Sequence, residues 1–192
     1  MPPIIKFDID YDPDTCWGLD EFKADGVLSG FVTLRIRNKK ILDYYPRGMN
    51  NSIVALLRSC FQDHIGADPQ IPKSDFKKWP LFYCDGNLDN DCGVINDFSV
   101  THSKNKVTLS NFYKCDCPSS TIISLPWTSW SAAIEKQATR VLRKCPPVKK
   151  DVSAENHPKY QSLRNELLYL LRELRKGIKK GQRPDISITS GS

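Results

Sequence analysis

Residues 29–42, SGFVTLRIRNKKIL, contain the pattern that decides the fold of this chain. Val32, Leu34 and Ile36 alternate with polar side chains, which is the period of a strand with one buried face. Residues 38–39, Asn-Lys, then offer a tight turn into an apolar pair. The stretch therefore predicts a β-hairpin, a unit from which antiparallel sheets are built.

Other segments extend this pattern along the chain. Strand character recurs at residues 4–10, 79–84, 93–101 and 106–113. After a predicted breaker at residues 46–48, Pro-Arg-Gly, apolar residues take helical spacing at 51–61, and they do so again from Trp127 to the prolines at 146–147. We expect an α+β fold: a mainly antiparallel sheet with two packed helices and a long C-terminal helix.

The C-terminal helix is expected to begin at Asn156 as its cap, with Pro158 in the first turn. Its apolar stripe consists of Tyr160, Leu163, Leu167, Leu170, Leu171, Leu174 and Ile178. The stripe would suit packing on the same domain or on a second subunit, and the sequence leaves both open. We expect an α+β domain over residues 1–147, a linker and helix over 148–183 and a flexible tail over 184–192.

Composition points to a reduced intracellular protein. The chain has 192 residues and seven cysteines, an odd number without a regular framework. Its start, MPPIIKFDID, has no basic region followed by an apolar stretch, and no segment approaches the roughly 18 apolar residues of a membrane span. We therefore expect a cytoplasmic protein without a membrane partner.

Charge is distributed unevenly within a net charge of +6. Residues 1–100 contain 15 Asp and Glu against 11 Lys and Arg, whereas residues 101–192 contain 7 against 17. Residues 140–183 alone contain 13 basic against 4 acidic side chains, which makes a nucleic-acid-associated protein one hypothesis. Cations at the C-terminal end of a helix also suit the helix dipole, so the pattern does not require nucleic acid.

Two metal sites can be considered from spacing. Asp10, Asp12 and Asp14 begin an EF-hand-like spacing, but Thr15 replaces the glycine that makes the sharp turn of such a loop. Zinc could be held by Cys84, Cys92, Cys115 and Cys117. Their C-x7-C and C-x-C spacings differ from the usual C-x2-C, so we expect no metal and no cofactor and keep zinc binding as an alternative.

Catalytic motifs are absent from the sequence. The three histidines, His64, His102 and His157, lie in different segments, and none belongs to a motif that pairs a base with a nucleophile. The chain has no G-x-S-x-G, no P-loop and no dinucleotide-binding glycine pattern. We therefore expect a binding protein rather than an enzyme.

The central block resembles a loosely defined group of small bacterial proteins. The resemblance covers residues 28–143 and is carried by the run at 30–38, the helix after it, and the segments WPLFYC, DCGVINDFSV and KVTLSNF. In that group a strand ends in cysteine, as at Cys84, and another rises from Cys-Gly, as at residues 92–93. Asp-Gly at 85–86 replaces a Cys-Gly of the group, which weakens any metal role.

Many members of this group are found beside secreted or contact-delivered toxins and are regarded as immunity proteins. The resemblance implies that the chain binds a cognate toxin and occludes its active site without catalysis. For a toxin with a basic cleft, acidic loops would form the contact, and the candidate partner-binding residues are Asp10, Asp12, Asp14, Asp85, Asp89, Asp91 and Asp97. For an acidic toxin, the basic end of the last helix would be the better candidate.

Overall fold

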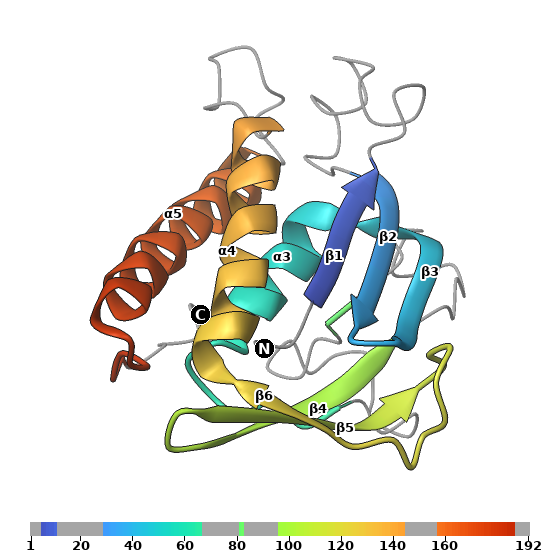
Figure 1. Cartoon of the computed structure of the whole chain (residues 1–192). Helices are drawn as coiled ribbons and strands as arrows, with labels where there is room; N and C mark the ends of the chain where they lie inside the picture. The colour runs from blue at the N-terminus through green and yellow to red at the C-terminus, as the bar shows by residue number, and fades with distance from the viewer. Residues whose placement is uncertain (1–4, 11–28, 67–80, 83–95, 145–156, 187–192) are drawn as a thin grey trace.

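The computed structural model describes residues 5–10, 29–66, 81–82, 96–144 and 157–186. Within them the chain has the expected α+β fold, with two three-stranded antiparallel sheets and three helices. The two sheets lie against each other at an angle, and the helices pack together on one side of them (Figure 1). The predicted single sheet is thus divided into two smaller ones.

The first sheet has the order β1 (Ile5–Asp10), β2 (Ser29–Ile36) and β3 (Lys39–Gly48). This confirms the hairpin, with a turn one residue earlier than predicted, where Arg37 takes a left-handed φ of 56°. Residues 46–48 do not break the structure but complete β3. Because β3 is an edge strand, Pro46 can lie within it without removing a hydrogen bond that the sheet needs.

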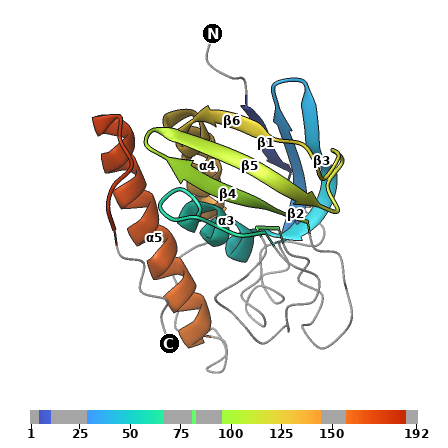
Figure 2. The same ribbon diagram turned by 90° about the horizontal axis from the view of Figure 1, so that it is seen from below.

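The second sheet has the order β4 (Asp97–Ser103), β5 (Lys106–Tyr113) and β6 (Ile123–Pro126). β5 has the predicted bounds, whereas β6 was not predicted. Of the predicted strand at 79–84, the structure describes only Leu81 and Phe82, and Phe82 forms an antiparallel bridge with Asn96. Figure 2 shows this sheet from its outer side, with the first sheet beside it.

The helices are α3 (Met49–Arg58), α4 (Trp127–Lys144) and α5 (His157–Lys180). α3 starts directly after β3. It begins two residues earlier than the helix predicted at 51–61, and it also ends three residues earlier. α4 lies between β1 and α5, and the Gln137 side chain ties it to the first sheet by donating to the Phe7 carbonyl (Figure 1). Among the described helices, none combines the length and apolar character needed to cross a lipid bilayer.

One hydrophobic core joins both sheets to all three helices. It includes Leu34 of β2, Leu57 of α3, Phe98 of β4 and Trp130 of α4. From α5 it takes the predicted stripe at Leu167, Leu170, Leu171 and Leu174. The C-terminal helix therefore packs on its own chain, which answers the question that its stripe left open. The predicted boundary between residues 147 and 148 lies outside the described residues.

Candidate protein-binding surface

The structure describes few of the acidic side chains that the sequence proposes as contacts. Asp12, Asp14, Asp85, Asp89 and Asp91 lie outside the described residues. Asp10 ends β1 opposite Phe31 of β2. Only the position of the Asp97 side chain can be compared directly with the prediction.

Asp97 does not lie on an exposed loop. It begins β4 with an exposed fraction of 0 %, and its Oδ1 accepts hydrogen bonds from the backbone N–H groups of Leu81 at 3.0 Å and Phe98 at 2.9 Å. The same oxygen lies 2.9 Å from Nε2 of His64. The His64 backbone in turn exchanges two hydrogen bonds with Val100 of β4. Asp97 thus connects three segments in the interior, because β4 is covered on both faces where it starts.

A second histidine also pairs with a carboxylate. Nδ1 of His102 lies 2.8 Å from Oδ1 of Asp63, which also accepts the His102 backbone N–H at 2.9 Å. Only 1 % of the His102 side chain is exposed, and its Nε2 has no hydrogen-bond partner among the described residues. Burial lowers the pKa of His102, and this effect outweighs the Asp63 hydrogen bond, which raises it.

The thiols of the described part lie in different surroundings. Cys60 is buried, donates to the Leu56 carbonyl, and has a raised pKa because burial disfavours the thiolate. Burial also raises the pKa of Cys117. Among the described residues, no three His, Cys, Asp or Glu side chains gather as a metal site. Since Cys84 and Cys92 lie outside that part of the chain, the zinc hypothesis stays a prediction.

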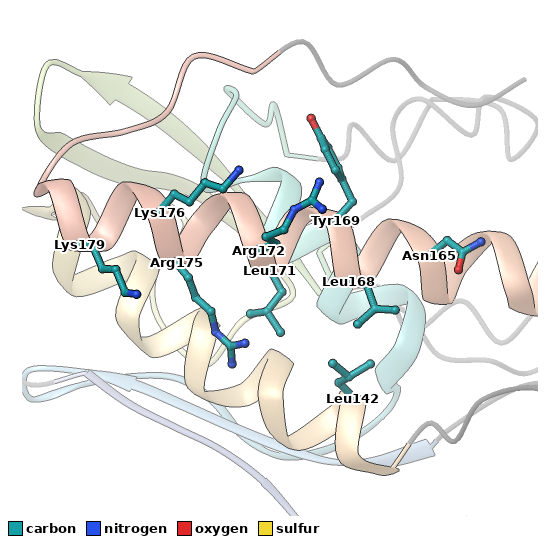
Figure 3. Close-up of a pocket in the computed structure, with 9 residues that line it drawn as sticks. All are labelled: Leu142, Asn165, Leu168, Tyr169, Leu171, Arg172, Arg175, Lys176 and Lys179. Carbon is teal, nitrogen blue, oxygen red and sulfur yellow. The ribbon is translucent and has the colours of Figure 1, made fainter.

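A groove opens on the outer side of α5, beside the end of α4 (Figure 3). We call it the α4–α5 groove, and it encloses about 640 Å³. It is lined by Leu142, Asn165, Leu168, Tyr169, Leu171, Arg172, Arg175, Lys176 and Lys179. All but Leu142 come from α5, where spacings of three and four residues place them along one side of the helix.

The groove has an apolar part and a cationic part. Leu168 and Leu142 point toward each other, and Leu171 lies next to them (Figure 3). Leu168 is 38 % and Tyr169 41 % exposed, which makes them two of the large apolar side chains that the described surface presents to solvent. The four cations follow toward the C-terminal end of α5, so apolar and charged contacts lie side by side.

The cations of the groove are only partly neutralised. Arg175 donates to Glu135 and to Thr139 of α4, each at 2.8 Å. Arg172 and Lys176 both contact the carboxylate of Glu173, at 3.2 and 2.8 Å. Lys179 forms no ion pair with the residues that the structure describes. Four cations thus meet two carboxylates, which leaves the groove positive.

The sequence contains one signal for this groove, which is a pair of apolar residues that do not belong to the core stripe of α5. Leu168 and Tyr169 are apolar but lie out of phase with Leu167, Leu170 and Leu171, which face the core. Apolar residues beside a core stripe widen the apolar face of a helix beyond what one neighbour can cover. The cations by themselves are explained by the helix dipole and do not point to a groove.

Comparison with protein-family models, with curated proteins and with solved structures finds no match to this chain.

Proposed function

We propose that this chain is a cytoplasmic immunity protein that binds a cognate bacterial toxin and neutralises it without catalysis. The observation that carries the proposal is the α4–α5 groove, where exposed Leu168 and Tyr169 adjoin four cations on a single helix. The resemblance of residues 28–143 to immunity-type proteins supplies the kind of partner.

The composition of the groove suits a protein partner. Tyrosine and arginine are enriched among the residues that contribute most to protein–protein binding, above all where an apolar centre is bordered by polar groups. Here the ring of Tyr169 lies 5.7 Å from the guanidinium of Arg172. A partner that covers these side chains would bury apolar surface and add charged contacts at its edge.

The helix that carries the groove is held in place before any partner arrives. Its inner face belongs to the core, and Arg58 of α3 donates twice to the carboxylate of Glu166, at 2.6 and 2.8 Å. Binding to a rigid surface loses less conformational entropy than binding to a mobile one. The position of α5 therefore supports a docking function.

Nucleic acid is the second candidate because of the cations on α5. Against it, Leu142, Leu168 and Leu171 offer neither charge to phosphates nor rings to bases, and Glu135 and Glu173 lie beside the cations. Gel-shift measurements at low and high salt test this candidate. Affinity that falls steeply with salt for DNA or RNA would favour it over the protein-binding proposal.

The acidic residues remain part of the proposal as a second contact region. They are Asp10, Asp12, Asp14, Asp85, Asp89 and Asp91. Their carboxylates would take the place of phosphates in a toxin with a basic cleft. Replacement of all six by asparagine would then slow association with such a toxin and make it less dependent on salt.

Co-expression tests the function itself. The chain is produced in bacterial cells together with toxins encoded by the genes next to its own, and growth is compared with cells that lack the chain. We expect growth to be restored against one toxin and the two proteins to elute as a one-to-one complex. A toxin from an unrelated locus is the control. If the chain protects against none of the neighbouring toxins, the proposal is contradicted.

A further inference from the structure

We infer that the α4–α5 groove is the docking site for an acidic amphipathic helix of the partner protein. On this view the leucines of the partner helix cover the apolar part of the groove, and its carboxylates pair with the cations of α5. The identification of that partner as a toxin rests on the proposed function. The chemistry of the occupant rests on the groove alone.

The apolar part determines that the occupant is amphipathic. Leu168 and Tyr169 remain partly exposed although Leu167 and Leu170, next to them in the sequence, are buried. Leu142 of α4 faces Leu168 across the groove (Figure 3). Side chains of two neighbouring helices thus form one apolar strip, against which a third helix can pack its own apolar stripe.

The charged part determines that the occupant is acidic. Arg172, Lys176 and Lys179 follow one another at intervals of four and three residues, so they lie along about 10 Å of one side of α5. Carboxylates at the same helical spacing on a partner helix would meet all three. Glu135 and Glu173 leave an excess of positive charge here, which a basic partner would oppose and an acidic one would neutralise.

The match in spacing favours a helical occupant over an extended one. Carboxylates three and four residues apart in a helix lie on one side, as the cations of α5 do, whereas in a strand successive side chains point to opposite faces. A helix can also bury leucines and expose carboxylates along the same edge. Helix-in-groove binding of this kind needs no opening of a sheet edge.

A synthetic peptide tests the groove without the toxin. The probe is a helical peptide of about 20 residues, long enough to be partly helical in water, with leucine at core spacing and glutamate beside it. Its binding to the full chain is followed by fluorescence anisotropy of a label on the peptide. We expect the acidic peptide to bind, to weaken when salt is raised from about 0.05 to about 0.5 M, and to bind far better than a lysine version.

Two pairs of substitutions locate the binding. Lys176→Glu with Lys179→Glu should weaken binding of the acidic peptide at least about tenfold. Lys106→Glu with Lys136→Glu makes the same change in net charge at exposed positions outside the groove, and it should leave binding near the wild-type value. Circular dichroism establishes that each variant keeps its helices.

A third variant, Leu168→Ala with Tyr169→Ala, changes no charge and removes two exposed side chains. It should weaken binding of the acidic peptide by about tenfold as well. Three results overturn the inference. The acidic and basic peptides bind equally well, neither peptide binds, or the Lys176→Glu, Lys179→Glu variant loses no more affinity than the Lys106→Glu, Lys136→Glu control. Dimerisation of the wild-type chain that the groove variants abolish also overturns it, because a second copy would then be the occupant.

The co-expression assay separates this inference from the proposed function. Loss of protection with Lys176→Glu and Lys179→Glu, but not with the control pair, supports both. If the Lys176→Glu, Lys179→Glu variant protects fully, the toxin does not bind at the groove. The proposed immunity function is then retained, and the inference about the groove is overturned for this partner. Lack of protection by the wild-type chain contradicts the function, while the peptide measurements still decide the groove.

Discussion

Asp97 illustrates how one residue can stabilise several segments at once. Its Oδ1 accepts the backbone N–H of Leu81 and of Phe98 and contacts Nε2 of His64. A buried N–H group without an acceptor is costly because it has lost water as well. In the interior, the carboxylate therefore takes the place of the backbone carbonyls that a neighbouring strand would otherwise offer to these N–H groups.

Replacement of this carboxylate should destabilise the fold. We expect Asp97→Ala to lower the free energy of unfolding by about 3 kcal/mol, since it leaves two buried N–H groups and a histidine without an acceptor. Urea unfolding followed by circular dichroism measures the change. Asp185→Ala, at an exposed position, is the control and should remain within about 0.5 kcal/mol of the wild type. Equal effects of the two variants would contradict the structural role of Asp97.

His102 should make the stability of the fold depend on pH. Because burial lowers its pKa in the folded state, the unfolded chain binds the proton more readily, and acidification favours unfolding. Stability from this group is present above about pH 6.5, the ordinary pKa of histidine, and is lost as pH falls from there. Asp63 raises the pKa and Arg183 lowers it further, so both bear on the size of the effect.

The measurement compares two proteins at two pH values. The free energy of unfolding of the wild type should decrease between about pH 7.5 and about pH 5. His102→Gln, which cannot take up a proton in this range, should be less stable at the higher pH but should show a smaller decrease. His64 and His157 stay in both proteins and serve as the internal reference. An equal decrease in both proteins would assign the pH dependence to other groups.

At the scale of elements, α5 has two faces with different tasks. Its inner face contributes four buried leucines to the core, and its outer face carries the groove. Arg58 and Glu166 add an ion pair between α3 and α5 that is partly shielded from water. A helix whose faces differ in this way can lose outer side chains without losing its position.

Two leucines on α5 allow a matched comparison of these faces. Leu170→Ala should lower the free energy of unfolding by about 2 to 5 kcal/mol because it leaves a cavity in the core. Leu168→Ala, two residues away and partly exposed, should cost well under about 1 kcal/mol. Chemical denaturation of both variants measures the difference. Similar costs would mean that α5 does not hold the orientation described here.

At the scale of the whole molecule, one core connects the two sheets. Residues of β2, β4 and all three helices contact one another in it, and Arg37 of the first hairpin donates to the Ser124 carbonyl of β6. The indole of Trp127 donates to the Cys60 carbonyl at 2.7 Å, which joins α4 to the end of α3. None of these parts has a separate core among the described residues.

A shared core predicts one cooperative unfolding transition. Trp127 and Trp130, two of the four tryptophans of the chain, are buried in α4, so their part of the tryptophan fluorescence reports on packing between α4 and its neighbours. Far-ultraviolet circular dichroism reports on the helices, including α5. The two signals should change at the same denaturant concentration, as they do in two-state unfolding. Loss of helix signal before the change in fluorescence would indicate that α5 unfolds separately.

Local pattern was enough to locate several elements. Alternation identified β1, β2 and β5, and apolar spacing identified α4 and α5. Both patterns depend only on the geometry of one element, which repeats every two residues in a strand and every 3.6 in a helix. β6 was not predicted because it has only four residues and includes Pro126, so its strand character comes from pairing with β5.

The sequence by itself determined which side chains share a face of a helix or strand and where charge accumulates. It also determined which catalytic motifs the chain lacks. Only the tertiary structure decided which faces are covered. It took Asp97 into the interior, placed α5 on α3 and α4, and left Leu168 and Tyr169 open beside the cations. Apolar burial has no preferred direction, so the partner of each face is chosen by long-range packing that no local period records.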